Sequence, residues 1–85
     1  MLNIEKNIND CIENQNIALK NLCEIKGVPE EAVDKGVETS EIFVRGFLSA
    51  YLSVGFISEK EMNKNYDYAV SLLRNTKLLF FEGER

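Results

Sequence analysis

The sequence predicts an all-α fold, a bundle of three helices that run up, down and up, and three observations support this prediction. Apolar residues recur at helical spacing through most of the chain, and a glycine or a proline separates the apolar segments. Only one short segment is strand-like, and it has no second segment with which to pair. The 85 residues leave room for one hydrophobic core, so we expect a single helical domain over residues 1–85.

The first helix is expected over about residues 3–26, where apolar positions are spaced alternately four and three residues apart. This seam consists of Ile4, Ile8, Cys11, Gln15, Ala18, Leu22 and Ile25. Such spacing is typical of a helix that packs lengthwise against another helix. Gln15 is polar and lies in the middle of the seam, so a buried amide at this position must be hydrogen-bonded. Gly27 is expected to supply the left-handed residue that ends the helix.

The second helix is expected over about residues 29–54. Pro29 suits the first turn, and the two glutamates that follow it complement the positive end of the helix dipole. The apolar positions keep one helical phase across Gly36, which favours a single long helix with a weak point at residues 36–39. The alternative is a helix that stops at this glycine and restarts behind a hydroxyl cap.

The third helix is expected to begin at residue 59 and to end at about residue 75 or 81. Ser58 and Glu61 have the spacing of a capping box, and Ile57 and Met62 have the spacing of a hydrophobic staple. The last apolar segment, Leu78-Leu79-Phe80-Phe81, is ambiguous between helix and strand. Because an isolated strand is unstable, we favour an extension of the third helix.

The expected core is thin for three long helices, so we predict self-association, most simply as a two-fold homodimer. Its members are Ile8, Ile12, Leu19, Leu22, Val44, Phe47, Leu48, Tyr51, Met62, Tyr66, Val70 and Leu73. The candidate contacts between copies lie on the first helix and in the tail: Ile4, Ile8, Cys11, Gln15, Leu78, Phe80 and Phe81. Small residues at Gly46, Ser49 and Ser53 either allow close approach of a neighbouring backbone or form a thin polar edge.

The residue types argue against catalysis and against metal or cofactor binding. The chain has no histidine, which is the commonest general base and a common metal ligand, and its glycines form no phosphate-binding loop. Cys11 and Cys23 lie about 18 Å apart on one expected helix, too far for a disulfide between them. We therefore expect no enzyme, no cofactor and no metal site.

Acidic residues are concentrated at the start of the second helix, in a chain whose net charge is −4. This acidic stripe consists of Glu30, Glu31, Asp34, Glu38 and Glu41, and it forms either a solvated face or a docking surface for a basic partner. We therefore predict a small acidic protein-interaction module, a regulator, inhibitor or adaptor that acts by binding another protein. The chain has no membrane-spanning or secretory segment, so a cytoplasmic location is expected.

The alternative function is a small DNA-binding transcriptional regulator. The expected joint at residues 55–58 connects two helices in the manner of a helix-turn-helix motif, with the third helix as the recognition helix. A sequence pI near 4.8 and the acidic stripe oppose this alternative, because a surface that tracks phosphates is normally basic. Nucleic acid is therefore not the expected partner.

Overall fold

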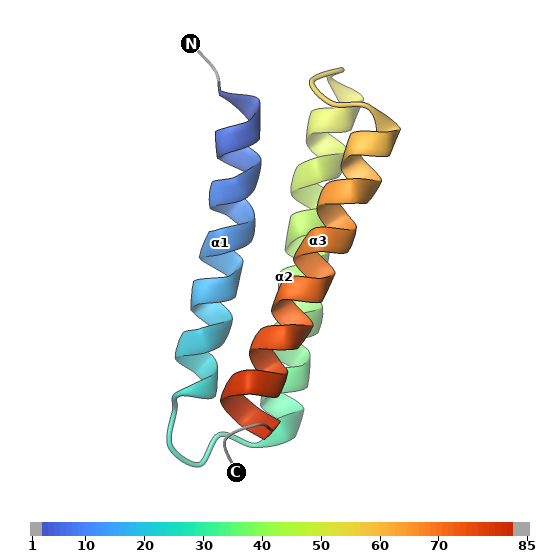
Figure 1. The fold of residues 1–85 in the computed structure, drawn as a ribbon. Helices are drawn as coiled ribbons and strands as arrows, with labels where there is room; N and C mark the ends of the chain where they lie inside the picture. Colours follow the sequence, from blue (N-terminus) through green and yellow to red (C-terminus); the bar gives the residue numbers. More distant parts are fainter. Residues whose placement is uncertain (1–2, 83–85) are drawn as a thin grey trace.

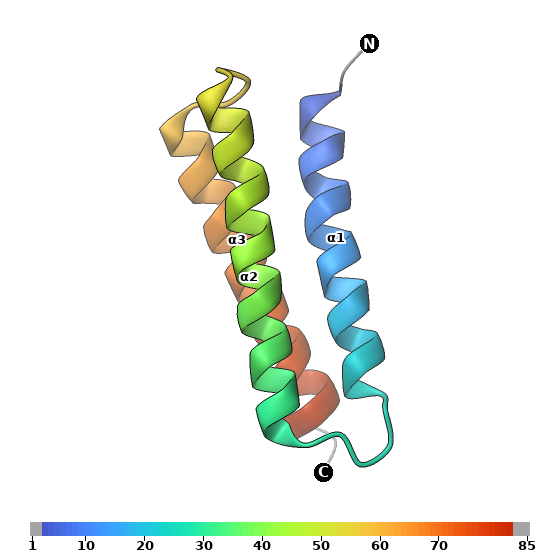
Figure 2. The ribbon, with the colours of Figure 1, turned by 180° about the vertical axis from the view of Figure 1, so that it is seen from behind.

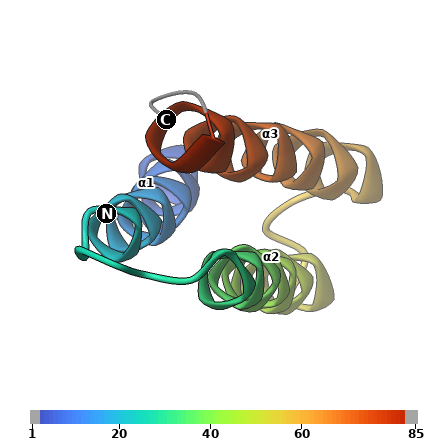
Figure 3. The ribbon, with the colours of Figure 1, turned by 90° about the horizontal axis from the view of Figure 1, so that it is seen from below.

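Three helices make up most of the structure, a computed structural model that describes residues 3–82. They are α1 (Ile4–Cys23), α2 (Glu30–Ser53) and α3 (Glu59–Lys77), and a π-helical turn, Leu78–Glu82, continues α3. Each helix runs antiparallel to the one before it (Figures 1 and 2). Viewed along the bundle, the three helices lie at the corners of a triangle (Figure 3). The predicted all-α bundle of three helices is confirmed, and the ambiguous segment at 78–81 is helical.

α1 begins behind a side-chain cap and ends earlier than predicted. Asn3 Oδ1 accepts a hydrogen bond from the backbone N–H of Lys6 at 2.9 Å, which satisfies one of the free amides of the first turn. The helix ends at Cys23, three residues before the predicted position. Gly27 has the expected positive φ of +78°, but it lies in the connection to α2 and not directly behind the helix.

α2 is a single unbroken helix, as predicted, and it continues through residues 36–39, where the sequence predicts a weak point. A Cβ atom at Gly36 would lie 2.7 Å from Leu22 Cδ2 on α1. Carbon atoms do not approach so closely without a shift of one of them. The glycine therefore serves the close packing of α1 against α2 and does not interrupt the helix.

The joint between α2 and α3 has the predicted geometry. Gly55 follows α2 with a φ of +79°, and Ser58 caps α3. Ser58 Oγ accepts from the Glu61 backbone N–H at 3.1 Å, and Glu61 Oε1 accepts from the Ser58 backbone N–H at 3.0 Å. These hydrogen bonds lower the pKa of the Glu61 carboxyl because they favour its charged form.

The core consists of two clusters arranged along the bundle axis. One contains Ile8, Cys11, Ile12, Val44, Leu48, Ile57 and Ala69, and the other contains Leu19, Cys23, Val33, Val37 and Leu73. Half of the predicted core residues are only half-buried, among them Phe47, Tyr51 and Tyr66. These aromatic side chains pack against the margin of the first cluster, whereas the fully buried side chains are aliphatic: Ile12, Leu48, Leu73, Val33 and Val44.

A buried amide is present in α1, but it belongs to Asn16 and not to Gln15. Asn16 is 6% exposed, whereas Gln15 is half-buried. Thr76 Oγ1 on α3 donates a hydrogen bond to Asn16 Oδ1 at 2.6 Å. The most buried face of α1 passes through residues 8, 12, 16, 19 and 23, one position further along the chain than the central part of the predicted seam.

Candidate binding surfaces

The acidic stripe lies on the side of α2 that faces the end of α3. Lys77 on α3 contacts Asp34 and lies 3.5 Å from Glu30, and Arg74 Nε lies 3.4 Å from Glu41 Oε2. The Glu41 side chain is only 13% exposed, and within residues 3–82 its buried Oε2 accepts no hydrogen bond. Three of the five carboxylates are thus paired with cations of α3, which reduces the charge that the stripe presents to a partner.

The other two carboxylates of the stripe point into solvent. Glu31 is exposed and lies 3.9 Å from the exposed Lys35, a separation at which a surface ion pair is weak. Glu38 is exposed, and among the described residues it has no ion pair. The uncompensated negative charge of the stripe is therefore centred on Glu38.

A groove of about 470 Å³ runs beside Glu38, between α2 and α3. Its α2 wall is acidic, its α3 wall is basic, and Val37 and Leu78 contribute its apolar surface. Leu78 is 50% exposed, so this groove offers both apolar area and charge to a partner. Its lining consists of Asp34, Val37, Glu38, Glu41, Arg74, Lys77 and Leu78.

The candidate self-association residues occupy different environments. Ile8 and Cys11 are buried in the core of the same chain, and Ile4 and Gln15 are half-buried. Leu78 is exposed, Phe80 packs against the second core cluster, and the side chain of Phe81 lies outside the described part of the structure. Most of the apolar surface of the predicted seam is therefore used within the bundle, and self-association stays a prediction.

A second groove, of about 420 Å³, lies between α1 and α2. Phe43, Phe47 and Tyr51 line it at intervals of one helical turn, and the rings of Phe47 and Tyr51 are 4.7 Å apart between centroids. The α1 side is polar, and Asn7 Nδ2 donates a hydrogen bond to Tyr51 Oη at 3.2 Å. Phe43 is 55% exposed, so the row of aromatic rings reaches the surface at Phe43, the member nearest the start of α2.

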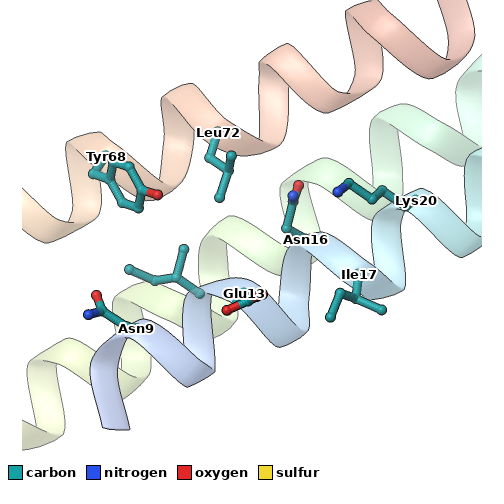
Figure 4. A pocket seen from close by; sticks show the side chains of 8 residues that line it. Asn9, Glu13, Asn16, Ile17, Lys20, Tyr68 and Leu72 are labelled. Atoms are coloured by element: carbon teal, nitrogen blue, oxygen red, sulfur yellow. The ribbon is translucent and has the colours of Figure 1, made fainter. Parts of the chain in front are cut away.

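The third groove, of about 480 Å³, separates α1 from α3 (Figure 4). Tyr68 and Leu72 project from α3, and the α1 side carries mixed polar and apolar residues (Figure 4). Asn16 belongs both to this lining and to the buried hydrogen bond with Thr76. Its lining has one acidic side chain, Glu13, and one basic side chain, Lys20, so the groove has no dominant charge. The α1 side consists of Asn9, Ile12, Glu13, Asn16, Ile17 and Lys20.

The two cysteines are free and buried. Burial raises the pKa of the Cys11 thiol and, together with nearby Glu24, that of the Cys23 thiol. A raised pKa keeps both thiols protonated at neutral pH, which is the unreactive form. Within residues 3–82, no three His, Cys, Asp or Glu side chains are grouped so that they could hold a metal ion.

The joint at residues 55–58 connects helices that fold back beside each other over their whole length (Figures 1 and 2). Helices of a DNA-binding helix-turn-helix cross at about 90–120°, so that the second can project into a groove. None of the helices in residues 3–82 combines the length and apolar character needed to cross a bilayer. Candidate binding surfaces in residues 3–82 include the three grooves described above and the outer faces of the helices.

Sequence reasoning missed the cations of α3 that face the acidic stripe. Lys77 and Arg74 lie more than thirty positions from their partners, so no local spacing connects them with α2. The useful signal was the antiparallel order of α2 and α3, which brings the end of α3 beside the start of α2. Comparison with protein-family models, with curated proteins and with solved structures yields no match.

Proposed function

We propose that this chain is a small helical protein-binding module, a regulator, inhibitor or adaptor, that acts without catalysis. The observation that carries the proposal is the groove beside Glu38, in which an exposed leucine borders uncompensated negative charge. Protein interfaces combine an apolar centre with a polar rim, and electrostatic complementarity at the rim selects the partner.

The groove favours a short amphipathic segment with apolar residues beside lysine or arginine. Its apolar residues would contact Leu78 and Val37, and its cation would meet Glu38. Asp34 and Glu41 already pair with Lys77 and Arg74, so they contribute to the shape of the groove more than to its attraction for a basic partner. The partner would thus bind through apolar contact and would be oriented by charge.

We also propose that the module acts in the cytoplasm and self-associates. Two buried free thiols support a reducing compartment, where unpaired cysteines persist. The small size of the two core clusters supports self-association, because a domain of 85 residues buries a modest fraction of its surface on folding.

The test uses charge reversal at a carboxylate that makes no ion pair within the described chain. Proteins retained from a lysate by the wild type are identified, purified and titrated against wild type, Glu38→Lys, Leu78→Asp and the control Asp67→Lys. Asp67 is exposed on α3, so its reversal changes the net charge equally away from the groove. We expect at least tenfold weaker binding for the first two variants and unchanged binding for the control. Equal affinities for all four proteins would refute the proposed surface.

A further inference from the structure

The amide of Asn16 is buried in the groove between α1 and α3, and half of its hydrogen-bonding capacity is unused. Asn16 is 6% exposed and lines this α1–α3 groove. Its Oδ1 accepts the hydrogen bond from Thr76, but within residues 3–82 its Nδ2 donates none. An amide nitrogen carries two N–H donors, and buried donors are nearly always hydrogen-bonded. The structure therefore leaves these two donors for a water molecule or a ligand.

The unpaired Asn16 Nδ2 is open to the groove and is not sealed in the core. Among the described residues that are buried or half-buried, Glu41 Oε2 is the only side-chain polar atom that is shut off from solvent without a hydrogen bond. Asn16 Nδ2 also has no hydrogen bond within the chain, so it must keep some contact with solvent. The groove that Asn16 lines supplies this contact, and its volume of about 480 Å³ lies in the range of small-molecule sites.

A second hydrogen-bond donor, the Lys20 ammonium group, lies one helical turn from Asn16. Lys20 follows Asn16 by four residues, so the two side chains share one face of α1. Figure 4 shows the nitrogen end of Lys20 directed toward Asn16. Lys20 is half-buried, forms no ion pair within residues 3–82, and its Nζ lies 5.9 Å from the centroid of the Phe80 ring. An amide N–H and an ammonium group without a carboxylate partner therefore converge at one end of the groove.

Apolar surface adjoins this pair of donors. Ile12 contributes to the lining although it is only 1% exposed, and Leu72 and Tyr68 project from α3 on the opposite wall (Figure 4). Ile17 is 46% exposed and adds aliphatic surface on the α1 side. Small-molecule sites typically combine an apolar lining with a few convergent polar groups that fix the orientation of the ligand. The α1–α3 groove has this composition, with Asn16 and Lys20 as the polar groups.

The charges of the groove determine which chemical group fits beside Asn16. The one carboxylate of the lining, Glu13, is exposed, and Figure 4 shows it directed away from Asn16 and Lys20. Glu13 precedes Lys20 by seven residues, which corresponds to about 10 Å along the helix, or about one Debye length at physiological salt. Its repulsion of an anion beside Lys20 is therefore weakened by screening. Two converging donors, one of them positively charged, favour an anionic group with two acceptor oxygens.

We propose that the α1–α3 groove binds a small carboxylate with an apolar chain, such as a medium-chain fatty acid anion. The two carboxylate oxygens accept hydrogen bonds from Asn16 Nδ2 and Lys20 Nζ, and the apolar chain lies against Ile12 and Leu72. A carboxylate fits two donors better than a phosphate group, whose three terminal oxygens need more partners. The site lies apart from the groove beside Glu38, which is formed by α2 and α3, so failure of either proposal leaves the other standing.

The test adds octanoate to protein labelled with nitrogen-15 and follows the side-chain amide of Asn16 by NMR. The two resonances of this amide are identified by their absence from the spectrum of Asn16→Asp, a variant that keeps an acceptor oxygen for Thr76. We expect a saturable shift of both resonances, with a dissociation constant below about 1 mM. Octan-1-ol and octylamine have the same chain without the negative charge, and acetate has the charge without the chain. Each of these three probes should bind at least tenfold more weakly than octanoate.

Two substitutions test the pair of donors. Lys20→Met and Asn16→Asp should each raise the dissociation constant for octanoate at least tenfold, measured from backbone amide resonances and by calorimetry. Lys60→Met removes the same charge from an exposed position of α3 outside the groove, so binding should be unchanged. Circular dichroism establishes that each variant is folded, and Lys20→Met leaves the buried hydrogen bond between Asn16 and Thr76 intact. The proposal is overturned if the Asn16 amide shows no saturable shift up to about 10 mM octanoate, if octan-1-ol binds equally well, or if Lys20→Met binds as the wild type does.

Discussion

Thr76 Oγ1 donates a hydrogen bond to Asn16 Oδ1 at 2.6 Å, and this contact links α3 to α1 between residues 60 positions apart. Both side chains are buried, and along α1 Asn16 lies between the residues of the two core clusters. A buried polar group that loses its partner has a large desolvation cost, whereas a matched pair stabilises modestly. The contact therefore mainly disfavours other registers of α1 against α3, because in those registers a buried polar group would lose its partner.

Removal of both members of this pair should destabilise the protein less than the sum of the two single removals. Asn16→Leu leaves the Thr76 hydroxyl in a buried site without its acceptor, and we expect a loss of about 1–3 kcal/mol. Asn16→Leu combined with Thr76→Val should lose less than the sum of the single substitutions, with a coupling of at least about 0.5 kcal/mol. Urea denaturation of the four proteins measures this cycle, and strictly additive losses would contradict it.

Alanine should have different effects at the two helical glycines. Gly46→Ala gains helix propensity in open space, so we expect about 0.5–1 kcal/mol of added stability in the monomer. Gly36→Ala gains the same propensity, but Leu22 must move away from a Cβ atom that would lie 2.7 Å from its Cδ2. Thermal denaturation at low protein concentration should give a smaller gain, or a loss, at position 36. A larger gain in stability for Gly36→Ala than for Gly46→Ala would show that Leu22 has free space to move.

Lys77→Met should show how much the ion pairs between α2 and α3 contribute to the free energy of unfolding. The Lys77 side chain is only 19% exposed and contacts Glu30 and Asp34, so we expect a loss of about 1 kcal/mol that shrinks at high salt. Lys35→Met is the control, because its ion pair with Glu31 is exposed and long. Equal effects of the two substitutions in salt titrations of stability would argue against a structural role for Lys77.

The capping box should make stability depend on pH at the acidic end of the range. The folded-state pKa of Glu61 is lowered by its hydrogen bonds with Ser58, so its contribution is present above the unfolded pKa and is lost as pH falls through the folded pKa. Ser58→Ala should cost about 1 kcal/mol near neutral pH. The difference in free energy of unfolding between the wild type and Ser58→Ala should become smaller as the pH is lowered. A difference that does not depend on pH would show that the Glu61 carboxylate contributes nothing.

The two thiols should react slowly with a disulfide reagent while the protein is folded. Burial raises the pKa of Cys11 and Cys23, so at pH 8 a smaller fraction is thiolate than in an unfolded chain. Because the folded state holds these protons more tightly, stability should fall as pH rises above the unfolded thiol pKa. Reaction rates before and after addition of denaturant measure the protection. Rapid labelling of folded protein would show that the helices open locally.

The start of α3 and the order of the helices could be predicted from local signals. The capping box at Ser58, the glycine at 55 and the apolar spacing each act within a few residues, so no tertiary information is required. The register of α1 could not be predicted in the same way. Its apolar residues cover a broad face, and only the positions of α2 and α3 decide that Asn16 lies inside while Ala18 and Ile25 are exposed.

The sequence by itself therefore determined that the protein is a three-helix bundle, where α2 and α3 begin, and which end of α2 is acidic. The tertiary structure alone decided that Lys77 and Arg74 pair with that acidic stripe and that Gly36 fits Leu22 while Gly46 has open space around it. The physical reason is the separation in sequence between the residues that interact. Helix formation and capping depend on neighbours three or four residues apart, whereas ion pairs and close packing depend on which helix faces meet in space.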